Sequence, residues 1–234
     1  MSRISCSHLW VCLSLNRRFG PGPHLVKFDV AIPGKGFNPS TFSSFTIRLH
    51  PINVMPHTVH LFLEQVYHGL WDDCAFVIKS PEVIQIGDLP KDSDGKTHKE
   101  KMMRFEDLGL SKIHFQEYNK DYPHKKWTVG LAGRPGGPDF YVNMKDNSKL
   151  HGPGGQKHYK VSEEADPCFG EVVEGRDTLD IMYSLPVDSN NFKPVLEKPV
   201  LITKATIVNM AETLAGADDQ HVATNMKDKH FTET

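Results

Sequence analysis

The stretch from Cys74 to Asp88, CAFVIKSPEVIQIGD, holds two short apolar runs on either side of Ser80-Pro81. Short apolar runs that flank a turn dipeptide are typical of two paired strands. The second run contains one polar residue, Gln85, and leads into Gly87-Asp88. We expect these strands to form part of a barrel wall, with Gln85 facing a pocket on that wall.

The composition is that of an ordinary globular protein. The 234 residues include 27 basic and 29 acidic side chains, for a net charge of −2, and 38% of them are hydrophobic. Such a chain can bury a real core. Nucleic-acid binding needs a clustered basic face, so this balance predicts no nucleic-acid partner. The 16 prolines and 18 glycines are spread along the chain and indicate many turns in a β-rich fold.

The four cysteines, Cys6, Cys12, Cys74 and Cys168, match no zinc-binding spacing and are too few for a disulfide scaffold. We expect Cys74 and Cys168 to be buried thiols, with one disulfide between them as the alternative.

No metal or cofactor is expected from the histidines and glycines. His57, His60 and His68 lie in one helical region without an acidic or cysteine partner at ligand spacing. Residues 151–158, HGPGGQKH, do not lead from a strand into a helix, so they predict a loop insertion rather than a phosphate-binding loop.

The chain divides into three parts by composition. Residues 1–22 predict a poorly ordered leader or the stub of a longer N-terminal region, with a signal sequence as an alternative. Their apolar run, residues 9–15, is far shorter than the roughly 20 residues of a spanning helix, so we expect no membrane insertion by this segment. Residues 23–210 form the predicted domain, and residues 211–234 a C-terminal helix and polar tail. The compartment, cytoplasm or secretory lumen, is left open.

Alternating apolar and polar residues predict the first strands. Residues 24–32, HLVKFDVAI, and residues 44–50, SFTIRLH, both alternate, and we expect them to pair as a hairpin. The period then changes to a helical one over residues 55–71, where Thr58 is the expected N-cap and Gly69 the stop.

The second half repeats this mixture of short strands and one helix. Residues 89–102, rich in lysine, predict an exposed loop. Residues 166–185 predict a strand and then a helix whose core face is Leu179, Ile181 and Met182. Further strands are expected over residues 127–133, 138–144 and 199–209. The order predicts a mainly β fold, a closed barrel capped by two α-helices.

Five stretches in collinear order resemble the cyclophilins, the barrel family of peptidyl-prolyl isomerases. They are residues 45–66, 74–88, 104–108, 129–144 and 169–182, of which the last two and the Gln-x-Gly-Asp ending at Asp88 are the most specific. The resemblance implies an eight-stranded antiparallel barrel with two helices. It also implies a groove on the outer wall that holds an X-Pro peptide.

Carried over residue by residue, the resemblance places Gln85 at the family's groove glutamine. The two family aromatics fall at Phe140, which we expect in the core, and Tyr141, which we expect as the floor of the proline pocket. The groove positions implied in this way are Val77, Glu82, Val83, Gln85, Gly133, Asp139, Phe140, Tyr141 and Asp166.

The departures from the family pattern concern the catalytic groups. Val77 stands where the family has its catalytic arginine, and Glu82 where it has a large aromatic. Asp139 replaces a glutamine and Asp166 a histidine. The family's Trp-Leu-Asp loop has become residues 147–155, NSKLHGPGG, which contain no tryptophan.

These departures bear on the chemistry directly. Rotation of an X-Pro amide breaks no bond, but the barrier is about 18–20 kcal/mol. A catalyst must bind the twisted amide more tightly than the planar forms, with an apolar pocket and a donor for the developing charge. Val77 cannot donate a hydrogen bond. We therefore expect a monomeric domain that binds proline-containing peptides or proteins, with weak or absent isomerase activity.

Two alternatives remain open. If the alignment is shifted by one or two residues, Lys79 or Arg134 falls at the position of the missing cation. The protein would then be an active isomerase that assists protein folding. The other alternative is a structural or interaction domain of a larger luminal or membrane-tethered protein.

Overall fold

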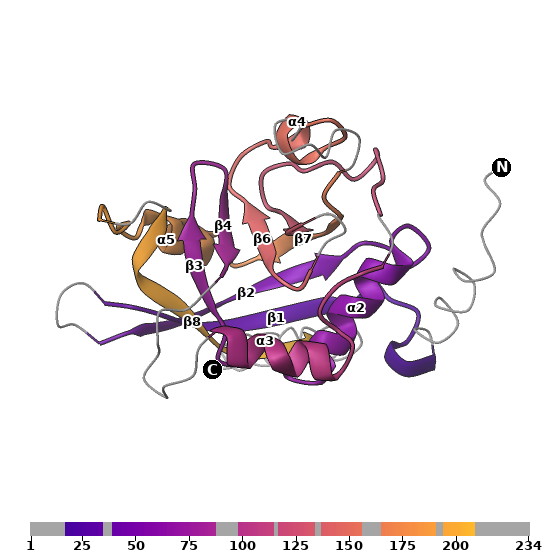
Figure 1. Ribbon diagram of the computed structural model, residues 1–234, viewed down its shortest axis with the longest axis horizontal. Coiled ribbons are helices and arrows are strands. Elements are labelled where there is room, and N and C mark those ends of the chain that lie inside the picture. The colour runs from indigo at the N-terminus through magenta and orange to yellow at the C-terminus, as the bar shows by residue number, and fades with distance from the viewer. Residues whose placement is uncertain are drawn as a thin grey trace, which may run out of the picture.

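Eight strands in the described part of the chain close into one antiparallel barrel in the order β1-β2-β7-β5-β6-β4-β3-β8 (Figure 1). The computed structural model describes residues 17–34, 39–87, 98–114, 117–133, 137–155, 165–190 and 194–208. The strands are β1 (Leu25–Ile32), β2 (Thr41–Leu49), β3 (Ala75–Lys79), β4 (Val83–Ile86), β5 (Thr128–Leu131), β6 (Phe140–Asn143), β7 (Cys168–Glu174) and β8 (Val195–Val208). The predicted fold class is confirmed. The predictions for residues 1–16 and 209–234 lie outside the described residues.

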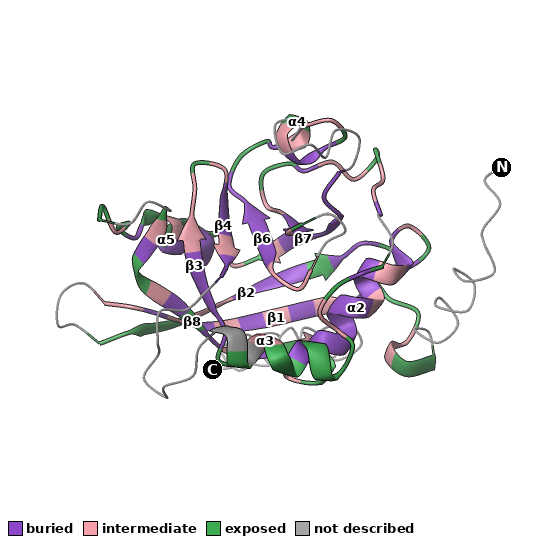
Figure 2. Cartoon of the chain, in the orientation of Figure 1, coloured by how far each residue is buried: buried purple, intermediate pink, exposed green. Residues whose placement is uncertain are grey.

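The first two strands form the predicted hairpin. Leu25 of β1 pairs with Arg48 of β2, and the register continues without a shift to Ile32 and Thr41. Every second residue of β1 is buried, which is the pattern that its sequence alternation predicts (Figure 2).

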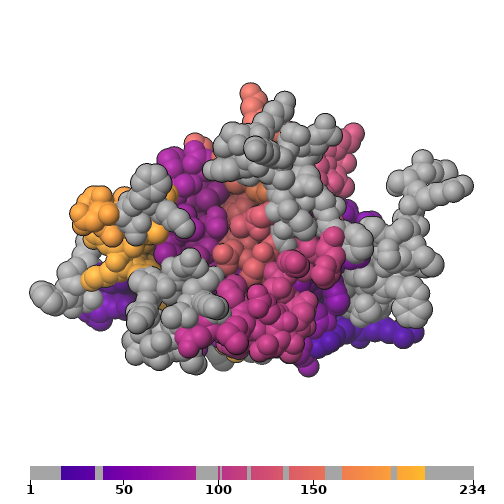
Figure 3. Space-filling model, viewed as in Figure 1, coloured from indigo at the N-terminus to yellow at the C-terminus, as the bar shows by residue number. Residues whose placement is uncertain are grey.

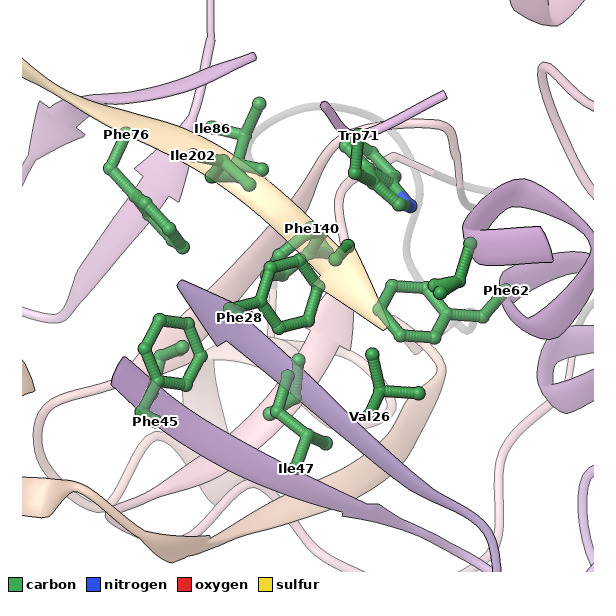
Figure 4. Close-up of a cluster of buried hydrophobic side chains, with 14 of the residues drawn as sticks. Val26, Phe28, Phe45, Ile47, Phe62, Trp71, Phe76, Ile86, Phe140 and Ile202 are labelled. Carbon is green, nitrogen blue, oxygen red and sulfur yellow. The ribbon is translucent and has the colours of Figure 1, made fainter. Parts of the chain in front are cut away.

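The interior of the barrel is filled by aromatic rings. Phe28 stacks on Phe45 with centroids 5.2 Å apart, and Phe140 contacts Phe28, Phe62 and Trp71 at 5.0–5.4 Å (Figure 4). Such edge and tilted contacts stabilise a core beyond the burial of area. The prediction that Phe140 belongs to the core is confirmed.

Both described cysteines are buried, and they form no disulfide with each other. Cys74 lies just before β3, and Cys168 begins β7. Burial raises the pKa of the Cys168 thiol to about 12, so this thiol is inert at neutral pH.

Helix α2 (Pro56–Tyr67) packs Val59, Phe62 and Val66 into the core. Its N-terminus differs from the prediction: the helix starts at Pro56, so Thr58 is not the N-cap, and Met55 provides no side-chain cap. The buried carboxylate of Glu117 caps the N-terminus of α2 instead. It accepts hydrogen bonds from the backbone N–H groups of His57 and Thr58 at 2.9 and 2.7 Å, and from the Thr58 hydroxyl at 2.6 Å.

Helices α3 (His98–Asp107) and α5 (Arg176–Ser184) correct two predictions. The predicted loop over residues 89–102 is wrong from residue 98 onward, because the charged residues from His98 form α3. Buried Phe105 anchors this helix against Trp71. In α5, Leu179 and Met182 are buried as predicted, but Ile181 is 52% exposed. Leu179 and Met182 are three residues apart and share one helix face, whereas Ile181 lies on another face.

A short fourth helix, α4 (Ser148–His151), follows β6. It lies above β6 and β7 in the view of Figure 1. None of the helices in the described part of the chain is long and apolar enough to cross a membrane.

Gly130 of β5 lies directly opposite Tyr141 of β6 and leaves the space that the tyrosine ring occupies. A Cβ atom at Gly130 would lie 2.6 Å from both Cζ and the hydroxyl oxygen of Tyr141. The ring therefore lies across the glycine backbone.

His50 follows β2 and is buried with its ring 4.2 Å from that of Tyr122. Burial is the largest influence on His50 and lowers its pKa to about 4, because the folded protein disfavours the charged imidazolium.

We predict that Glu117→Gln lowers the free energy of unfolding by about 1–3 kcal/mol, because two N–H groups of α2 lose a charged acceptor. Urea unfolding measures this change. Glu106→Gln, at an exposed position of α3, is the control and should change stability by less than about 0.5 kcal/mol. Equal effects of the two substitutions would contradict the capping role.

We predict that Gly130→Ala destabilises the fold by about 1–3 kcal/mol, because the new methyl group displaces the Tyr141 ring. In a Tyr141→Ala background the clashing atoms are gone, so the same substitution should cost much less. Denaturant unfolding of the four variants gives this coupling. An identical cost in both backgrounds would show that the ring is not what excludes a side chain at residue 130.

We predict acid destabilisation from His50. Between pH 6.5 and about 4 the unfolded chain takes up a proton that the folded chain does not, so stability falls as the pH falls through this window. The expected loss is about 2–4 kcal/mol by pH 4. His50→Gln should flatten this slope in unfolding experiments across the pH range. An unchanged slope would mean that His50 does not carry the proton uptake.

Candidate functional site

Five of the nine predicted groove positions lie on the neighbouring strands β3, β4 and β6, and the other four lie in segments next to β4, β5, β6 and β7. Ile84 and Gln85 of β4 pair with Val142 and Tyr141 of β6, and β6 pairs in turn with β5. Because side chains alternate along a strand, Phe140 points into the barrel and Tyr141 lies on its outer side. In the space-filling view, the surface of β3 and β4 lies beside that of β6, with α3 below them (Figure 3).

The structure separates the predicted groove residues into a buried and an accessible group. Tyr141 is 1% exposed and Asp166 3%, so the tyrosine ring offers almost no surface to an added ligand. The buried group is Val77, Val83, Phe140, Tyr141 and Asp166, and the more accessible group is Glu82, Gln85, Gly133 and Asp139.

Val77 lies on β3 where the pairing with β4 is irregular. The register shifts between Phe76, which pairs with Ile86, and Ile78, which pairs with Gln85. The Val77 side chain is only 4% exposed and is aliphatic, so it contributes packing and no polar contact.

The nearby cation Lys79 is directed elsewhere. Its ammonium group donates a hydrogen bond to the carbonyl oxygen of Leu185 at 2.7 Å and lies 5.3 Å from the ring centroid of Tyr183. These contacts hold Lys79 at the end of α5. Arg134, the other residue considered as a replacement cation, lies outside the described residues.

Glu82 sits in the turn between β3 and β4 and is paired with a cation. Lys145 Nζ donates to Glu82 Oε1 at 2.8 Å, and this hydrogen bond lowers the pKa of Glu82. The negative charge at this predicted groove position is therefore partly neutralised at neutral pH.

Tyr141, Asp166 and His151 form a buried polar cluster. The Tyr141 hydroxyl donates to Asp166 Oδ2 at 2.9 Å, and His151 Nδ1 lies 2.6 Å from the same oxygen. A carboxylate only accepts, so Nδ1 carries the proton that His151 donates. The His151 ring also lies against the Tyr141 ring, with centroids 4.6 Å apart and planes inclined by 30°.

His124 extends this cluster toward α4. Its Nε2 lies 2.9 Å from the carbonyl oxygen of Asp166, which only accepts, so Nε2 carries a proton. Its Nδ1 faces the amide nitrogen of Asn143 at 3.4 Å, which only donates. This arrangement places the ring proton of His124 on Nε2. Asn147 continues the network by donating to Asn143 Oδ1 and to the carbonyl oxygen of Glu82.

His124 and His151 are the site residues that the sequence did not reveal. The sequence marks His151 only as the first residue of a glycine-rich insertion. The available signal was Asp166: an acidic residue at a buried position requires donors, and histidine is a suitable one. Among the described residues, no group of three or more histidine, cysteine or acidic side chains is placed to hold a metal ion.

Comparisons with known proteins agree with this barrel. The family model for "Cyclophilin type peptidyl-prolyl cis-trans isomerase/CLD" matches residues 38–207, well over half of the chain. A comparison with curated proteins finds no significant match.

Among solved structures, a cyclophilin-type isomerase of Cryptosporidium parvum is 15% identical, with a TM-score of 0.54, and the match covers 80% of this chain and 98% of that chain. A structure of that isomerase in the presence of the dipeptide Ala-Pro is 13% identical, with a TM-score of 0.51 and 80% and 99% coverage. At such identities the likeness shows the fold. Together with the family match, it establishes that the chain belongs to the cyclophilin-type peptidyl-prolyl cis-trans isomerase family.

Proposed function

We propose that this cyclophilin domain is a recognition module for proline-containing peptides or proteins and that its isomerase activity is weak or absent. One observation carries the second part. Val77, which the resemblance places at the family's catalytic arginine, is a buried aliphatic residue that cannot stabilise charge on a twisting amide.

The expected loss of rate is large. Removing one well-placed donor from a charge-stabilising site costs about 10²–10³ in rate. Lys79 does not replace this donor, because its ammonium group is held by Leu185 and the ring of Tyr183. The alternative of an active isomerase that depends on Lys79 is therefore disfavoured.

The peptide is proposed to lie along the accessible part of the groove, the rim formed by Glu82, Gln85, Gly133 and Asp139. These residues are half-buried or exposed, whereas Tyr141 is covered by His151. The Cryptosporidium parvum isomerase was studied with Ala-Pro, which supports an X-Pro segment as the first ligand to test. The acidic side chains of the rim favour a peptide with a basic residue.

We predict that the protein accelerates isomerisation of an X-Pro test peptide at least about 10²-fold less than a cyclophilin that retains the arginine. NMR exchange spectroscopy on both proteins, measured in parallel, gives the two rates. Val77→Arg should raise the rate, whereas Ile78→Arg, at the adjacent position of β3 and outside the predicted groove, should not. A wild-type rate equal to that of the arginine-containing cyclophilin would overturn the proposal of weak activity.

We further predict that an Ala-Pro peptide shifts the backbone amide resonances of Gln85 and Gly133 in the wild-type protein. Substitution of Gln85 by Leu should weaken these shifts. If the amides of the rim do not respond at millimolar peptide while resonances elsewhere do, the proposed rim is not the binding surface.

A further inference from the structure

The ring of His151 occupies the outer side of Tyr141, where the family resemblance places a bound prolyl ring. Its centroid is 4.6 Å from that of Tyr141, and its Nδ1 lies 2.6 Å from Asp166. A five-membered ring of this same chain therefore fills the space that a peptide would need. We call the walls around it, Tyr141, His124 and Asp166, the imidazole pocket.

We propose that the imidazole pocket is an internal site for a basic side chain, that of His151 itself, and that its occupation excludes a prolyl ring. This inference rests on the proposed function, because it leaves the rim as the surface on which the peptide binds.

The carboxylate of Asp166 sets this preference. It is 3% exposed and accepts hydrogen bonds from Tyr141 and His151 through one oxygen, Oδ2. A buried carboxylate that loses a donor becomes costly. An imidazole, guanidinium or ammonium group replaces the donor when it enters, whereas the proline ring has no N–H to offer.

The ring face of Tyr141 also favours a basic group over a prolyl ring. The electron-rich face of a tyrosine attracts a cation or a polarised imidazole. His124 forms the remaining wall, with its ring centroid 5.4 Å from that of His151 and 6.0 Å from that of Tyr141. A carboxylate and two aromatic rings around one occupant make a site suited to a flat, positively charged or hydrogen-bond-donating group.

The frame of the pocket does not depend on the side chain of His151. Its backbone N–H donates to the carbonyl oxygen of Asn147, and its carbonyl oxygen accepts from the N–H of Asp166, both at 2.9 Å. Removing the imidazole should therefore leave α4 and Asp166 in place and open a cavity of imidazole size.

The test is chemical rescue of the vacated pocket. In His151→Gly, imidazole should raise the melting temperature and bind at least tenfold more tightly than to the wild type. N-acetylhistidinamide should likewise bind at least tenfold more tightly than N-acetylprolinamide, which has the same backbone. Adding Asp166→Asn to His151→Gly should remove most of this preference. His68→Gly, at an exposed histidine after α2, is the control and should show no rescue.

Two outcomes would overturn the proposal. One is that N-acetylprolinamide binds to His151→Gly as tightly as N-acetylhistidinamide. The other is that imidazole binds the variant no better than the wild type. These outcomes leave the isomerase and rim experiments unaffected, so a failure here is distinguishable from a failure of the proposed function.

A measurement on the wild-type protein decides the question if His151→Gly does not fold. Titration with N-acetylprolinamide should leave the ring resonances of Tyr141 and His151 unchanged at millimolar concentration. Saturable shifts of both rings would show that a prolyl group displaces His151 and would refute the exclusion.

Discussion

A carboxylate that is almost fully removed from water must be given hydrogen-bond donors, and Asp166 is such a carboxylate. The arrangement around Tyr141 follows from this requirement. The hydroxyl of Tyr141 reaches Asp166 while its ring lies across Gly130, and the end of α4 brings in His151. Each donor supplies only one of the hydrogen bonds that Asp166 needs, so the loss of either donor destabilises the whole cluster.

The positions at which we predict departures from the family pattern are connected in space. Asp166, which the resemblance places at the family's histidine position, is the residue that binds His151, and residues 147–155, which the resemblance places at the family's Trp-Leu-Asp loop, supply α4. Asn147 also donates to the carbonyl oxygen of Glu82, another predicted groove position. These contacts make the wall around Tyr141 one connected polar unit.

The barrel could be predicted because its cues are local. The alternation over residues 24–32 and the paired runs around Ser80-Pro81 each specify a strand from neighbouring residues alone. The same logic could not find the cap of α2, because Glu117 lies about sixty residues from Thr58. Helix α3 was missed because Phe105 is a single buried anchor in a highly charged segment. His151 was missed because its role depends on Asp166, which comes from another part of the chain.

The closing strand β8 has a consequence for the newly made chain. Its residues pair with β1 along one side and with β3 along the other, so neither of those strands has its second neighbour until residues 195–208 have left the ribosome. Unpaired strand edges are templates for association between chains. The nascent polypeptide therefore exposes two unpaired strand edges, on β1 and on β3, until β8 is available to pair with both.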